Sequence, residues 1–118
     1  MIEEKEQKLL ELLKKAIADK ENLATATEVI RSTTASDIRN LVDIISKNIS
    51  LADFPVVMSI LEEAFAKGTK GSDGVPMMLD WIHEEFIKSE KGCEFADIMC
   101  ERFESAYYHG RGMQTKGM

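Results

Sequence analysis

Residues 76–108 read PMMLDWIHEEFIKSEKGCEFADIMCERFESAYY, and apolar side chains recur in them at the spacing of an α-helix. Pro76 suits the first turn of a helix, because its ring fixes φ and that turn needs no amide donor. Lys88 and Lys91 precede Gly92, a composition typical of a helix end. We therefore predict a break at Gly92 between two antiparallel helices. The side chains expected to be buried are Met78, Leu79, Ile82 and Phe86, followed by Phe95, Ile98, Met99, Phe103 and Ala106.

The chain before this stretch shows the same periodicity. Residues 2–20 combine an apolar stripe with Glu–Lys pairs four residues apart, and a short helix is expected to start at the capping-box sequence Thr25–Glu28. Residues 38–49 place aliphatic side chains on one helix face. A further helix is expected to begin at Asp53 and to end before Gly68. The side chains expected to point inward are Ile2, Leu9, Leu10, Leu13, Ala16, Ile17, Val29, Ile30, Ile38, Leu41, Val42, Ile45, Ile49, Val57, Met58, Leu61, Ala64 and Phe65.

These segments predict an all-α fold, a compact bundle of five or six short helices whose last two are antiparallel. No alternating run of strand-forming residues is present. A chain of 118 residues is long enough for one hydrophobic core and short for two, so we expect a single domain over residues 1–109. Residues 110–118 contain three glycines and are expected to form a disordered tail.

The formal net charge of -6 comes mainly from residues 53–104, which hold twelve acids and five bases. A surface of this sign repels a phosphate backbone, so nucleic acid is not an expected partner. No run approaches the roughly 18 apolar residues of a membrane span, and we expect no membrane partner. Cys93 and Cys100 form no Cys-x-x-Cys pair, and free thiols suit a reducing compartment. We therefore expect a cytoplasmic protein.

Three side chains offer a candidate metal site. Asp80, His83 and Glu84 lie three and four residues apart, so one helix face presents all of them. Helical di-metal sites use a related element on two helices, with further carboxylates, whereas it occurs once here. We assign no metal site and expect no cofactor. A metal-binding or phosphotransfer bundle that uses His83 is the alternative function, although neighbouring carboxylates would repel an incoming phosphoryl group.

No set of residues converges on a catalytic site. Cys100 is surrounded by acids, which disfavour the thiolate of a nucleophile, so we expect a buried structural cysteine there. Met77, Trp81 and Tyr108 point away from the predicted buried stripes, and exposed Met and aromatic side chains mark partner sites when they are contiguous. We predict a non-enzymatic interaction or regulatory module that binds a protein partner or itself, as a homodimer, through Met77, Trp81 and Tyr108.

Overall fold

A computed structural model describes residues 4–71 and 74–107 of the chain, with side chains described from residue 6 onward. Over these residues the fold is all-α, as predicted, with six α-helices and two 3-10 turns, at Lys20–Asn22 and Ala35–Asp37. The helices are α1 (Glu4–Ala18), α2 (Leu23–Arg31), α3 (Ile38–Asn48), α4 (Phe54–Phe65), α5 (Met77–Lys88) and α6 (Cys93–Ala106). No helix among the described residues is long and apolar enough to cross a membrane.

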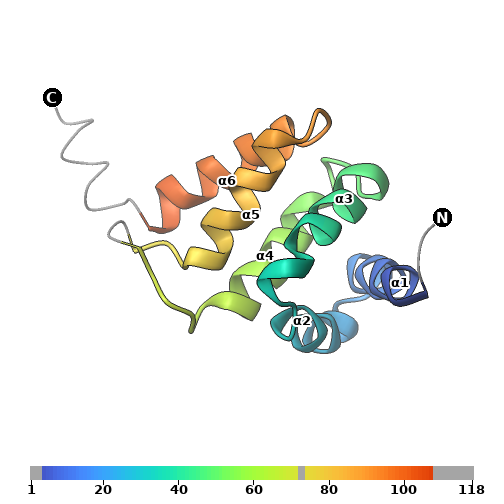
Figure 1. Cartoon of the computed structure of the whole chain (residues 1–118). Coiled ribbons are helices and arrows are strands. Elements are labelled where there is room, and N and C mark those ends of the chain that lie inside the picture. Colours follow the sequence, from blue (N-terminus) through green and yellow to red (C-terminus); the bar gives the residue numbers. More distant parts are fainter. Residues whose placement is uncertain (1–3, 72–73, 108–118) are drawn as a thin grey trace, which may run out of the picture.

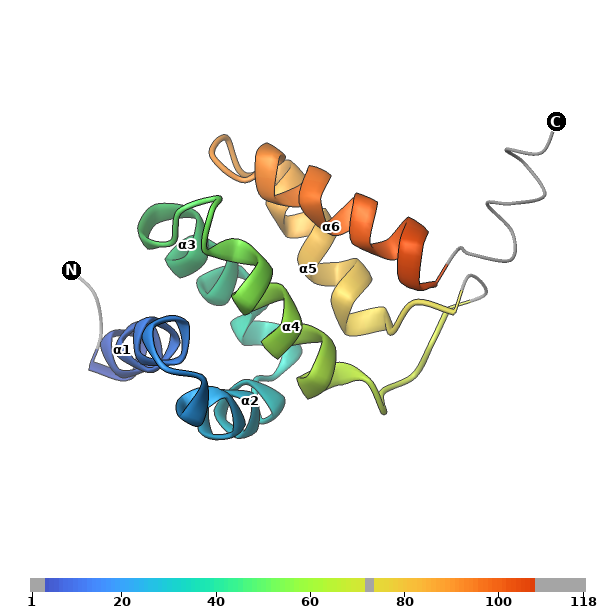
Figure 2. The same ribbon diagram turned by 180° about the vertical axis from the view of Figure 1, so that it is seen from behind.

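Helix α4 lies at the centre of the bundle (Figure 1). It packs against α1 and α2 on one side and against α5 and α6 on the other, while α3 packs against α1 and α5. Figures 1 and 2 show α5 and α6 side by side and antiparallel, which confirms the predicted arrangement of the last two helices. The seam between α3 and α5 therefore joins two segments that lie far apart in the sequence.

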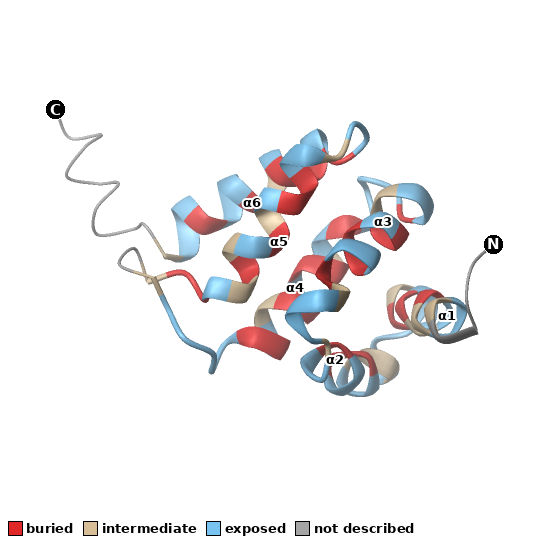
Figure 3. Cartoon of the chain, in the orientation of Figure 1, coloured by how far each residue is buried: buried red, intermediate tan, exposed pale blue. Residues whose placement is uncertain are grey.

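The buried side chains form one hydrophobic cluster. In Figure 3 the helix segments coloured as buried lie mainly on the sides of the helices that face one another. The five aliphatic residues predicted for the third helix are all buried. Phe54 of α4 packs edge-on against Phe86 and Phe95, with ring centroids 5.7 and 4.9 Å apart, so it joins α4 to the α5–α6 hairpin. Edge-to-face aromatic pairs add about 0.5–1.5 kcal/mol beyond the area that they bury.

The break between α5 and α6 falls at Gly92, as predicted. A Cβ atom at this position would lie 2.3 Å from the carbonyl oxygen of Phe86 and 2.9 Å from its Cα. The backbone of the turn therefore approaches the end of α5 so closely that a glycine is required. The amide of Gly92 donates to the carbonyl of Ser89, and Ala96 donates to the carbonyl of Gly92, which starts α6.

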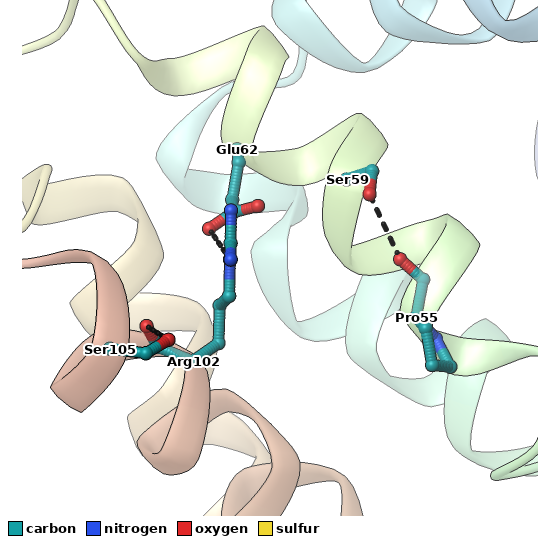
Figure 4. Close-up of polar contacts among 5 residues, drawn as sticks. All are labelled: Pro55, Ser59, Glu62, Arg102 and Ser105. Atoms are coloured by element: carbon teal, nitrogen blue, oxygen red, sulfur yellow. Dashed lines mark hydrogen bonds and ion pairs between the residues drawn. The ribbon is translucent and has the colours of Figure 1, made fainter.

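A polar contact fastens α6 to α4 (Figure 4). The Arg102 Nε donates to the Glu62 carboxylate at 2.7 Å, and this hydrogen bond and the opposite charge raise the pKa of the guanidinium. The same view shows Ser59 and Ser105 donating to backbone carbonyls of their own helices. Tyr107 follows α6, and burial, then the negative charge of Glu62, raises the pKa of its phenol.

Several sequence expectations are wrong in detail. Helix α2 begins at Leu23, so Thr25 lies inside the helix rather than capping it. Val29 is 42% exposed, because successive residues lie about 100° apart around the helix axis and the next residue, Ile30, points into the core. Ala106 is exposed because it lies in the last turn of α6, beyond Phe103, the last buried residue of that helix. Ile2 and the predicted tail lie outside the described residues.

Candidate partner-binding surface

Helix α5 buries one face in the core and exposes the opposite face to solvent. Leu79 and Ile82 are fully buried, whereas Met77 and Trp81 are 54% and 45% exposed. Met77 and Trp81 lie four residues apart, so they are neighbours on the outer side of the helix. Their exposure agrees with the orientation expected from the sequence, and their role in binding stays a prediction. Tyr108, the third predicted residue, lies outside the described residues.

A groove runs beside Trp81 along the seam between α3 and α5. It consists of two hollows of about 280 and 330 Å³ that share Arg39 and Glu85. We call it the Trp81 groove. The first hollow is lined by Ala35, Ser36, Ile38, Arg39, Asn40, Trp81 and Glu85, and the second by Arg39, Val42, Asp43, Glu85, Lys88 and Ser89.

Glu85 supplies a carboxylate at the base of this groove. The residue is 9% exposed. In the described part of the chain its carboxylate oxygens lie 3.6 Å from the Arg39 Nε and 3.6 Å from the Lys88 Nζ. These distances bring charge attraction, but they are too long for hydrogen bonds, so the carboxylate keeps the capacity to accept one. The Arg39 side chain is 82% exposed and available to a partner.

The candidate metal ligands are not gathered into a site. Within residues 4–71 and 74–107, no group of three or more His, Cys, Asp or Glu side chains is placed to hold a metal ion. Asp80 and His83 are half-buried and Glu84 is exposed. The imidazole of His83 lies 5.7 Å, centroid to centroid, from the Phe103 ring. The geometry therefore lends the metal-binding alternative no support.

The expected burial of Cys100 is wrong. Both Cys93 and Cys100 are free and exposed on α6. The inner side of this helix is taken by Phe95, Met99 and Phe103, which turns Cys100 outward with its acidic neighbours. The Cys93 thiol donates weakly to the carbonyl of Ile87 at 3.8 Å. The acids next to Cys100 in the sequence, Asp97, Glu101 and Glu104, disfavour an activated thiolate at that position.

A second groove, of about 390 Å³, opens between α1, α2 and α3. Sequence reasoning missed it, because it assigned Leu9 and Val29 to the core. The signal that could have revealed it is the set of leucines at positions 9, 10, 12 and 13. Together they cover a wider part of the helix surface than one packing contact requires, so some of them are left to line a groove. Its apolar lining consists of Leu9, Leu12, Val29, Leu41 and Ile44, and its polar lining of Glu6, Lys8, Ser32, Thr33, Asp37 and Asn40.

Comparison of the chain with protein-family models, with curated proteins and with solved structures finds no match. The function is therefore interpreted from the surface itself. A further hollow of about 420 Å³, lined by Leu23, Ala24, Thr27, Glu28, Arg31, Ser59, Ile60 and Glu63, has no aromatic side chain in its lining. The Trp81 groove differs from both other hollows in combining an exposed aromatic side chain, an exposed guanidinium and a buried carboxylate. These groups can make apolar, cationic and hydrogen-bond contacts with one partner, which is what specific recognition requires.

Proposed function

We propose that this protein is a small, non-enzymatic interaction module that binds a protein partner through the outer face of α5 and the Trp81 groove. The observation that supports it best is the position of Trp81, 45% exposed at the edge of a groove that also presents Arg39. Tryptophan and arginine are the side chains that most often dominate the free energy of an interface. Met77, one turn away, adds an adaptable apolar contact. We further propose a cytoplasmic location, which suits two exposed free thiols.

The distribution of exposed apolar side chains favours α5 over the rest of the surface. In the described part of the chain the large ones are Val29, Leu51, Met77, Trp81 and Ile87, and the last three belong to α5. Single exposed apolar residues are common on proteins and need no explanation. Met77 and Trp81 lie on the same side of α5, and Trp81 also lines a groove with charged groups, which is a more specific feature.

Replacement of Trp81 tests the proposal. We expect Trp81→Ala to weaken self-association or partner capture by about 10- to 30-fold, because truncation of an interface hot spot costs about 1.4–2 kcal/mol. Sedimentation velocity and pull-down measure the loss, and circular dichroism checks that the helix content is unchanged.

Leu51→Ala is the matched control, since Leu51 is 38% exposed in the turn between α3 and α4 and lines neither hollow of the Trp81 groove. Binding by Trp81→Ala that equals the wild type would show that the surface is misplaced. Native mass spectrometry adds a second check. A stoichiometric metal ion that is lost in His83→Ala would favour the metal-binding alternative instead.

A further inference from the structure

We propose that the partner of this surface presents a short acidic segment, in which an apolar side chain packs on Met77 and Trp81 while an Asp or Glu carboxylate binds Arg39 and Lys88. This inference rests on the proposed function and specifies the chemistry of the partner. It places two different contacts at two ends of one groove.

Two cations converge on the hollow of about 330 Å³. The Arg39 Nε lies 3.6 Å from one carboxylate oxygen of Glu85, and the Lys88 Nζ lies 3.6 Å from the other. The Arg39 and Lys88 side chains are 82% and 66% exposed, whereas that of Glu85 is 10% exposed. In the described part of the chain these two cationic side chains make no other ion pair and no hydrogen bond. An incoming group therefore meets N–H donors that are still unused, above a buried acid.

The acids of the groove are already engaged within the chain. Asp43, the other acid that lines this hollow, pairs with Lys47 at 3.1 Å. Glu85 is shared by Arg39 and Lys88. With Lys47 included, three cations stand against two carboxylates, so the groove carries one positive charge in excess. A carboxylate from a partner complements this local charge, whereas a cationic side chain is repelled by it.

The spacing along α5 sets the distance between the two contacts. Trp81 and Lys88 are seven residues apart, which at about 1.5 Å per residue is about 10 Å along the helix. An extended peptide covers this distance in about three residues. A guanidinium can donate two parallel hydrogen bonds to one carboxylate, so Arg39 suits an Asp or Glu side chain in particular. The segment should therefore carry its acid about three residues from its apolar side chain.

The charge of the whole chain limits how acidic the partner can be. A net charge of -6 repels an anion at long range, and salt of about 0.1 M screens this repulsion beyond about 10 Å. One carboxylate in direct contact with Arg39 and Lys88 gains more than it loses at such a distance. A nucleic acid, with a phosphate at every nucleotide, meets the full repulsion.

Two matched peptide series test the inference. Each peptide consists of Gly and Ser with one Phe and one Glu at varied separation, and the second series carries Lys in place of Glu. We expect the Glu series to bind the full chain at least about fivefold more tightly than the Lys series, with an optimum near a separation of three residues. Isothermal titration calorimetry measures the affinities. Trp81 is the only tryptophan of the chain, so its emission should move to shorter wavelength as Phe covers the indole.

Charge reversal in the protein locates the carboxylate contact. Lys88→Glu should weaken binding of the Glu series at least about fivefold and strengthen that of the Lys series. Lys91→Glu is the matched control, because it changes the net charge equally and Lys91 is exposed but lines neither hollow of the Trp81 groove. Circular dichroism checks that both variants keep the wild-type helix content.

The outcomes separate the two proposals. A preference for Glu that Lys88→Glu reverses and Lys91→Glu leaves intact supports the acidic segment. Equal binding of the two series, a preference for Lys, or no binding of either series overturns the acidic segment, while a partner whose capture depends on Trp81 keeps the interaction module. Binding of the Glu series that Trp81→Ala does not weaken overturns both.

Discussion

At the scale of single residues, Gly92 decides how the chain turns between α5 and α6. Its Cα hydrogen faces the carbonyl oxygen of Phe86, where a Cβ atom would approach to 2.3 Å. That oxygen belongs to the backbone, so the clash cannot be relieved by a change of rotamer. The sequence predicts a break at this position from helix-end composition, but the close approach is visible only in the folded chain.

We therefore expect Gly92→Ala to lower the free energy of unfolding by about 1–3 kcal/mol, the size of effect that overpacking produces. Urea unfolding followed by circular dichroism measures the change. Gly68→Ala is the matched control, because the added Cβ would lie 3.3 Å from the nearest atom, the Phe65 carbonyl oxygen. Equal urea midpoints for the two variants would contradict the close approach at Gly92.

Tyr107 gives a prediction about pH. Burial, and then the negative charge of Glu62, raises the pKa of its phenol in the folded protein above the value of about 10 in the unfolded chain. The folded state then holds the proton more tightly, so this contribution to stability is complete below about pH 10 and is lost as the pH rises through the folded-state pKa. We expect Tyr107→Phe to lose less stability than the wild type above about pH 10. Urea midpoints across this range measure the difference, and parallel curves would contradict it.

At the scale of elements, the α5–α6 hairpin is held by Phe54. This ring is fully buried and contacts Phe86 and Phe95, one from each helix of the hairpin. The ion pair between Glu62 and Arg102 is a second link, but the Arg102 side chain is 51% exposed, so solvent weakens its contribution. The aromatic contact should therefore dominate the attachment.

Phe54→Ala should cost about 3–5 kcal/mol, because it leaves a cavity where three rings meet. Hydrogen exchange should show a larger loss of protection in α5 and α6 than in α1, which packs against α2, α3 and α4 instead. Leu51→Ala, exposed in the preceding turn, is the control and should change little. Uniform loss of protection over all six helices would show that the hairpin does not open separately.

At the scale of the whole molecule, the candidate surface exists only because α3 and α5 pack together. Arg39 comes from α3, and Trp81 and Glu85 come from α5. The helical periodicity of the sequence places Met77 and Trp81 outside the buried stripes, and both are exposed. It gave no reason to connect them with Arg39, because no local pattern links residues so far apart in the chain.

The sequence by itself determined the helical class, the antiparallel last two helices and most of the core. It did so because helical periodicity, capping and breaks are local properties, visible within a few turns of chain. Only the tertiary structure decided which side chains at the edges of the stripes are exposed, as Val29 and Cys100 are. It also decided which charges meet at Glu85, because burial and groove shape depend on which helices become neighbours, and those contacts are made across the bundle rather than along the chain.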